Sequence, residues 1–242
     1  MVKLMTIAIM EKTIIDLNTV LHTVWIIICT VMVILSQVGY MMKETGTIKM
    51  KNNSVILLKT ILVISVSSIT FFLFGFGFAL EAKGGIVGQD HFIGVNYIYA
   101  DYTKFIFYFA LCVKMSVIAT GSIGERIEID RYLFFSFLNS TFIFPLGLAW
   151  CWNNGWLQNM GFIDYGGVAI VHLMGGLSGF VGTFLIGPRI GLFNSKNAIS
   201  YIADDDKFLQ EQAELSVSDS DTDLDKQSVN KYLIEYETKQ IK

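Results

Sequence analysis

Charged side chains are scarce in this sequence. Asp, Glu, Lys and Arg make up 16% of its 242 residues, whereas hydrophobic residues make up 53%, and the mean hydropathy is +0.53. Because several apolar runs of about 20 residues accompany this composition, it argues against a soluble protein and a polytopic membrane protein is expected. The sequence also lacks the alternating segments of about ten residues that mark outer-membrane barrels, so the expected spans are helices.

Residues that hold metals or perform catalysis are also few. The three cysteines, Cys29, Cys112 and Cys151, are widely spaced, odd in number and within or near apolar runs. That spacing argues against a metal or disulfide framework and favours buried thiols, so we expect no metal and no cofactor. A histidine inside a membrane span, without a nucleophile or a metal partner, forms no catalytic constellation, and we expect the protein not to be an enzyme.

The formal net charge of −3 is divided unevenly along the chain. Residues 1–193 carry 12 basic and 10 acidic side chains, a net of +2, whereas residues 194–242 carry 6 and 11, a net of −5. The acidic tail argues against nucleic acid as a partner, and its few apolar residues predict a mostly disordered segment. We therefore expect three regions: an extracellular N-terminal segment at 1–19, a membrane domain at 20–193 and a cytoplasmic tail at 194–242.

Five apolar segments are long enough to cross a bilayer, at residues 20–42, 55–80, 104–124, 132–150 and 165–187. The loops that follow the first and third segments are basic, with Lys43, Lys49 and Lys51 in one and Arg126 and Arg131 in the other. The loop at 151–164 has no Lys or Arg. Because basic loops stay in the cytoplasm, we expect the N-terminus outside and the tail inside, in a plasma membrane.

The fifth apolar segment has one ionisable residue between Asp164 and Arg189, which is His172. A rise of ~1.5 Å per residue places His172 ~12 Å below Asp164, near the middle of the bilayer, where an ionisable residue is a candidate for function. Glycines recur at helical spacing after it, at 175, 176, 179 and 182. Small residues on one flank let another helix approach closely, so Gly175, Gly179 and Gly182 are expected to pack against a neighbour. On the same reasoning His172 is expected to face protein or a cavity.

The residues of this segment resemble the signature of the ammonium transporter family, which includes the Rhesus-type channels. The matching residues are Asp164-Tyr165-Gly166-Gly167, Val171-His172, Gly175-Gly176 and Gly187-Pro188-Arg189, with Gly166 where the family usually has alanine. Further ordered matches are Trp25, Gln37-Val38-Gly39, Glu44-Thr45-Gly46, Lys51-Asn52-Asn53, Leu57-Leu58-Lys59, Gly75-Phe76-Gly77, Gly121-Ser122, Glu125-Arg126, Pro145, Trp152 and Gly155-Trp156-Leu157. The resemblance covers residues 20–193.

This resemblance implies ammonium transport across a membrane, with ammonium or ammonia as the substrate. Family members have about eleven spans, in which two inverted five-helix repeats enclose a narrow pore, and they assemble as trimers. Our sequence resembles one repeat. We therefore expect an all-α membrane bundle of about five helices that resembles the first inverted repeat, in a truncated member of the family.

The resemblance also implies a site at the outer mouth. Ammonium needs acceptors and aromatic faces that replace its hydration shell, and a carboxylate raises the local cation concentration, so Asp164 and Trp152 are the expected ammonium-binding residues. A plain helix cap is the alternative role for Asp164. His172 is the expected pore residue, which binds ammonia or relays a proton, with a hydrogen-bonded core histidine as the alternative.

Two positions depart from the family pattern and argue against an intact conduction path. Leu111 stands where the family brings a phenylalanine to the outer gate, and Phe107 and Phe109 are not in register with it. Lys114 lies inside the third span, where the family is apolar, at a cost of ~2–3 kcal/mol unless the lysine pairs or snorkels.

Two alternatives to transport remain open. In one, the chain is a non-conducting regulatory or interaction subunit that co-assembles with full-length transporters. In the other, it is a non-functional fragment. The expected partners are ammonium or ammonia, membrane lipid, and other transporter subunits in a homo- or hetero-oligomer.

Overall fold

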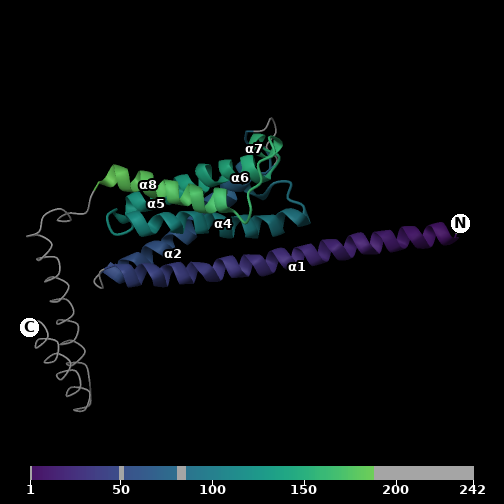
Figure 1. Ribbon diagram of the computed structural model, residues 1–242, viewed down its shortest axis with the longest axis horizontal. Helices are drawn as coiled ribbons and strands as arrows, with labels where there is room; N and C mark the ends of the chain where they lie inside the picture. Colours follow the sequence, from purple (N-terminus) through teal and green to yellow (C-terminus); the bar gives the residue numbers. More distant parts are fainter. Residues whose placement is uncertain (1, 49–51, 81–85, 188–242) are drawn as a thin grey trace, which may run out of the picture. The chain divides into compact units, whose positions relative to one another are not determined.

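An apolar segment in a bilayer forms a helix because a helix satisfies its own backbone hydrogen bonds. The computed structural model describes residues 2–48, 52–80 and 86–187, with side chains from Met10 onward. Within these ranges no strand occurs, and five helical segments are long and apolar enough to cross a membrane (Figure 1). The predicted all-α class and the five spans are confirmed. The predicted tail at 194–242 lies outside the described residues.

The five spans differ in how regular they are. The first is one helix, α1 (Val2–Thr47). The second joins α2 (Asn53–Thr70), the π-helical turn η2 (Phe71–Gly75) and α3 (Phe76–Ala79). A short 3₁₀ turn, η4 (Phe92–Gly94), precedes the third, α4 (Tyr99–Ile123). The fourth joins α5 (Ile129–Leu138), η5 (Asn139–Ile143) and α6 (Phe144–Trp152), and a short α7 (Trp156–Asn159) follows it. The fifth joins η6 (Val168–Leu173) and α8 (Met174–Ile186).

Several predicted boundaries differ from the observed ones, among them the following three. Helix α1 begins at Val2, so the segment predicted to precede the first span continues that span as helix. Helix α4 begins at Tyr99 rather than at 104, because the Asp101 carboxylate caps its first turn by accepting the Ile98 N–H at 3.0 Å. The fifth span begins at Val168 rather than at 165, because the two residues before it, Gly166 and Gly167, have left-handed backbone angles.

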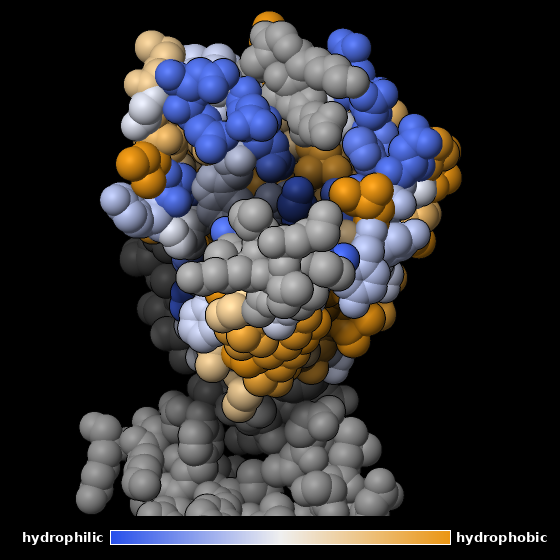
Figure 2. All heavy atoms as spheres, turned by 90° about the vertical axis from the view of Figure 1, so that its right-hand side faces the viewer, coloured by the Kyte–Doolittle hydropathy of each residue, from blue (hydrophilic) through white to orange (hydrophobic). Residues whose placement is uncertain are grey.

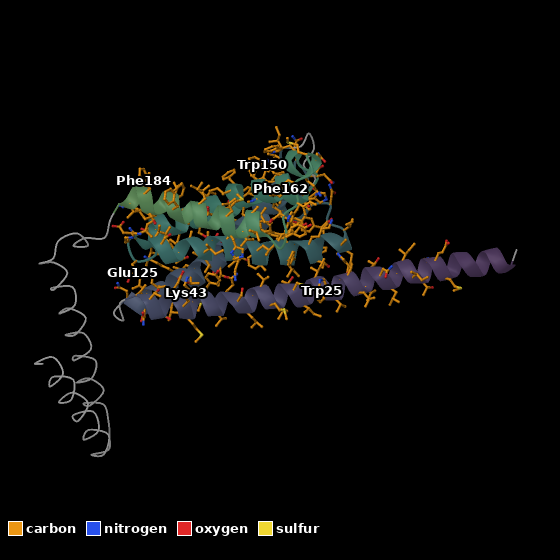
Figure 3. All side chains as sticks on the ribbon, viewed as in Figure 1. Trp25, Lys43, Glu125, Trp150, Phe162 and Phe184 are labelled. Atoms are coloured by element: carbon orange, nitrogen blue, oxygen red, sulfur yellow. The ribbon has the colours of Figure 1, made fainter. Side chains whose placement is uncertain are left out.

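The two ends of the helices carry different residues. Lys43 and Glu125, from the two loops predicted to be cytoplasmic, lie at one end, and Trp150 and Phe162 lie at the other (Figure 3). Figure 2 looks at the end that bears Trp150 and Phe162, where hydrophilic residues gather over the loops. The grouping at the two ends agrees with the predicted alternation of the spans, while the side of the membrane that each end faces remains a prediction.

The core forms where the irregular turns of the second and fourth spans meet. The Thr70 and Ser140 hydroxyls lie 2.5 Å apart, so one donates to the other. The Thr70 hydroxyl oxygen also lies 2.8 Å from the Val66 carbonyl oxygen, and the Ser140 hydroxyl oxygen lies 2.8 Å from the Ser136 carbonyl oxygen. A Cβ atom on Gly75 would lie 2.5 Å from the Ser140 carbonyl oxygen, so only glycine allows this approach. Buried rings surround the contact, among them Phe71, Phe76 and Phe144.

Lys114 joins α4 to α1 rather than facing lipid. Its ammonium group donates to the Ser36 hydroxyl at 2.5 Å and lies 4.3 Å from the centre of the Tyr40 ring. Both partners are on α1, which packs along α4. The predicted cost of an unpaired lysine in the third span is therefore reduced, because a hydroxyl and an aromatic face replace part of its hydration.

Candidate functional site

Asp164 lies in the turn that leads into the fifth span. Its carboxylate accepts the Ala169 N–H at 2.9 Å and the Ile170 N–H at 3.4 Å. The chain can fold back in this way because Gly166 and Gly167 have φ angles of 65° and 77°, which glycine adopts without strain. The carboxylate therefore caps the first turn of the span, where its negative charge also suits the positive end of the helix dipole.

Trp152 ends the fourth span and is surrounded by aromatic rings from the third. The Phe107 ring stacks on it, with centroids 6.4 Å apart and planes within 9°. The Tyr108 ring lies 6.1 Å away, tilted by 54°. The sequence placed Phe107 out of register with the gate, and Leu111, which is in register, is buried in the core cluster one turn further along α4. The rings beside Trp152, those of Phe107 and Tyr108, therefore lie about one turn before position 111, where the family has its gate phenylalanine.

Asp164 and Trp152 line one cavity of about 430 Å³. The cavity opens among the fourth span, α7 and the turn before the fifth span, and its other lining residues include Tyr108, Cys151, Gln158 and Phe162. Phe162 lies at the loop-bearing end of the molecule (Figure 3). A carboxylate and an aromatic face in one cavity can hold a small cation, since both attract positive charge.

Tyr108 also lines this cavity, although nothing in the sequence pattern selected it. Its hydroxyl donates to the Asn153 side-chain oxygen at 3.3 Å, and the Asn153 side-chain nitrogen donates to the Ala79 carbonyl at 2.7 Å. These bonds link the third span, the end of the fourth and the end of the second. The aromatic spacing along α4 at 105, 107, 108 and 109 was the available signal, but it does not tell which ring faces Trp152.

The glycines of the fifth span pack against α4. A Cβ atom on Gly175 would lie 2.9 Å from the Met115 carbonyl oxygen, and one on Gly179 would lie 2.6 Å from the Ser122 hydroxyl. A Cβ atom on Gly182 would lie 3.0 Å from the Ile123 side chain. Each distance is shorter than an ordinary van der Waals contact, so these positions allow the two helices to lie as close as they do.

His172 lies outside this packed flank. Its side chain is exposed in the chain, and so is Gly176, where an added Cβ atom would meet no side chain and no neighbouring helix within 4 Å. The sequence grouped both residues with the packed glycines and expected His172 to face protein or a cavity. The irregular turn η6, which contains His172, changes the angular relation between residues before and after it, so a regular 100° spacing does not hold across it.

Arg126 fastens the opposite end of α4 to the end of α8. From the turn that follows α4, its guanidinium donates to the Gly187 carbonyl at 2.7 Å and back to the Ser122 carbonyl in the last turn of α4. A second contact reaches the Thr183 hydroxyl at 3.5 Å. A planar guanidinium with several donors suits the free carbonyls at a helix end. Arg126, which was expected from the sequence only as a loop charge and as one of the family matches, thus ties the end of α4 to the end of α8.

Comparison with known proteins by sequence finds ammonium transporters. The model of the Ammonium Transporter Family matches residues 24–207. Ammonium transporter 3 of Dictyostelium discoideum is 33% identical over 187 residues, which are 75% of this chain and 42% of that protein. Ammonium transporter 1 member 3 of Solanum lycopersicum is 32% identical, over 72% of this chain and 40% of that protein.

The structural comparison agrees. A solved structure described as a Sensor Amt Protein superposes with a TM-score of 0.68 at 31% sequence identity, over 72% of this chain and 46% of that one. The chain thus spans less than half the length of these relatives. Since the family model matches well over half of the residues and the fold agrees with it, the chain belongs to the Ammonium Transporter Family.

Proposed function

We propose that the chain takes part in ammonium transport across a membrane and binds ammonium at its outer cavity. The observation that carries the proposal is the presence of the Asp164 carboxylate and the Trp152 ring on the wall of one cavity of about 430 Å³. The carboxylate attracts the cation, and the rings of Trp152 and Tyr108 replace water around it by cation–π attraction. The names of the relatives, which are ammonium transporters, support this assignment.

A conduction path would require more protein than the chain supplies by itself. His172 is the proposed pore residue, and in the chain alone its side chain is exposed among apolar neighbours such as Leu173 and Leu177. A polar group in that position costs several kcal/mol if lipid covers it, on the order of the cost of other unsatisfied groups in a bilayer. We therefore propose that another subunit covers the His172 side and completes the pore.

Substitutions at Asp164 test the proposal. Asp164→Asn keeps an oxygen that can accept the Ala169 N–H but removes the charge, whereas Asp164→Ala removes both. We expect both variants to lose methylammonium uptake in cells that co-express a full-length ammonium transporter rendered inactive on its own. Asp130→Asn, which removes an exposed carboxylate from the start of α5, is the control and should keep uptake. If Asp164→Asn keeps uptake and Asp164→Ala loses it, Asp164 acts only as a helix cap, and the proposal that it binds ammonium is wrong.

The second candidate is a regulatory subunit that does not conduct. The exposed side of the fifth span that carries His172 supports it, because a longer relative could cover this side without forming a pore. The description of one structural relative as a Sensor Amt Protein also supports it. Co-expression with an active full-length transporter separates the two. A conducting role adds methylammonium flux that Asp164→Asn removes. A regulatory role changes the flux of the partner and is indifferent to Asp164→Asn.

We also propose that the protein lies in the plasma membrane with the N-terminus outside and the tail inside. The loop charges support this orientation. A cysteine introduced at Ser218 should be labelled in sealed vesicles only after permeabilisation. Labelling of this cysteine in intact vesicles from the outer side would contradict the proposed topology.

A further inference from the structure

Helix α1 is much longer than a bilayer is thick. Its 46 residues span about 69 Å at ~1.5 Å per residue, against a hydrocarbon core of about 30 Å. In Figure 1 its N-terminal part runs on past the end of α4. Every residue from Met10 to His22 is exposed, and Thr23 is the first that is partly buried. Glu11, Lys12 and Asp16 keep this extension out of hydrocarbon, because charges there are costly.

The extension nevertheless carries an apolar stripe. Hydrophobic residues alternate at spacings of four and three, at Met10, Ile14, Leu17, Leu21 and Val24. Their side chains are 59%, 55%, 57%, 58% and 48% exposed. The same spacing continues through the membrane at Ile28, Val31, Leu35 and Val38, which are 44% to 63% exposed. In the extension, where polar residues lie between the apolar ones, a repeat of 3.5 residues is the pattern of a coiled coil. Inside the span the seam is part of a broader exposed apolar face that also carries Trp25, Ile27, Met32 and Ile34.

The stripe faces away from the rest of the bundle. At ~100° per residue, the buried residues of α1, Thr30, Gln37 and Glu44, lie about opposite to it. Lys114 also meets α1 on that opposite side, through Ser36 and Tyr40. The stripe is therefore open to a second helix along its whole length, while α4 packs against the opposite side only from Thr23 onward.

We propose that α1 forms a parallel coiled coil with α1 of one or more further copies of this chain. A second copy fits better than another partner because the membrane holds all copies at the same height and in the same direction. Equivalent heptad positions then meet without any adjustment of register, and each seam is complementary to itself. The charged residues Lys12 and Asp16 lie off the seam, so no like charges face each other in it. The remainder of each copy then lies outside the coil, with the His172 side free.

Cysteine cross-linking in the full chain tests the proposal. The background variant is Cys29→Ala, because Cys29 is half-buried on α1 whereas Cys112 and Cys151 are buried. Leu17→Cys places a thiol in the seam, and Thr19→Cys places one on the opposite side of the same turn, with both native residues exposed in the single chain. The proteins are reconstituted at high dilution in phosphatidylcholine vesicles and oxidised with copper phenanthroline, so that two thiols are oxidised to a disulfide by the added oxidant.

We expect covalent dimers from Leu17→Cys at a yield at least about fivefold above that from Thr19→Cys. Native mass spectrometry of Leu17→Asp in mild detergent should show loss of the oligomer, whereas Thr19→Asp should retain it. Equal cross-linking of the two cysteines, or an oligomer that survives Leu17→Asp, would overturn the proposal. Absence of cross-linking at both positions would also overturn it and would indicate an extension that lies on the lipid surface.

Discussion

The two sides of the fifth span differ both in their residues and in what they contact. One side presents Gly175, Gly179 and Gly182 to α4 at distances that leave no room for a Cβ atom. The other side presents His172, Leu173 and Leu177, all of them exposed. In a bilayer apolar exposure is not itself unfavourable, so packing between helices depends on close fit rather than on hydrophobicity. The comparison shows that the glycines pack the fifth span against α4, while the histidine side meets no other helix of the described chain.

The largest expected effect comes from filling the packed side. Gly179→Leu would place side-chain atoms against Ser122 and the Ala119 backbone, where a Cβ already lies 2.6 Å and 3.3 Å from the nearest atoms. We expect separation of α8 from α4 and destabilisation by about 3 kcal/mol or more, measured as a lower unfolding temperature in detergent. Gly176→Leu is the matched control, because its Cβ position is open to at least 4 Å, and it should be near neutral. Equal effects of the two substitutions would contradict the difference between the two sides.

The next effect comes from the end of the same contact. Arg126→Ala removes the guanidinium that donates hydrogen bonds to the Gly187 and Ser122 carbonyls. We expect this loss to lower the free energy of unfolding by about 2 kcal/mol. Arg131→Ala is the control, because its 3.3 Å ion pair with Glu128 has both side chains 74% exposed. Exposed pairs of this kind contribute little, so this variant should unfold at the wild-type temperature. Both are read by thermal unfolding in the same detergent.

A smaller effect is expected on the far side of α4. Lys114→Met removes the bond to Ser36 and the contact with Tyr40 but supplies an apolar chain of similar length. Since the lost interactions are with neutral groups and the lysine no longer has to be desolvated, we expect a change of no more than about 1 kcal/mol. Urea or thermal unfolding of the variant measures it, and accessibility of a cysteine at Met41 reports whether α1 stays on α4. A change of several kcal/mol would show that Lys114 has a stronger partner than these two.

The smallest effect on stability belongs to His172. Because its side chain is exposed in the single chain, His172→Leu should change the unfolding temperature of the lone protein very little, within about 0.5 kcal/mol. The same variant should abolish methylammonium flux by an assembly that conducts. A large loss of stability in the lone chain would mean that His172 is a packed structural residue, and the two sides of the fifth span would then be alike.

The spans and their order could be predicted from the sequence, because a bilayer imposes a minimum length and a low charge on every crossing segment. The turn before the fifth span was also within reach, since an Asp followed by two glycines is what a capped, left-handed turn requires. Residues at the boundaries were harder, because Asp101 extends α4 by bonding backward to Ile98, and such a bond is a property of one capped turn rather than of hydropathy.

What the sequence determined by itself is therefore the number of helices in the described ranges that are long and apolar enough to cross a membrane, the residues at the two ends of the bundle and the order of Asp164 and His172 along the fifth span. Only the tertiary structure decided which side of each helix meets protein. It paired Lys114 with Ser36, brought Phe107 and Tyr108 to Trp152, and separated His172 from the glycines that follow it. The physical reason is that lipid and protein interior are equally apolar, so a hydrophobic pattern cannot distinguish them, and contact is set by fit and by hydrogen bonds between distant residues.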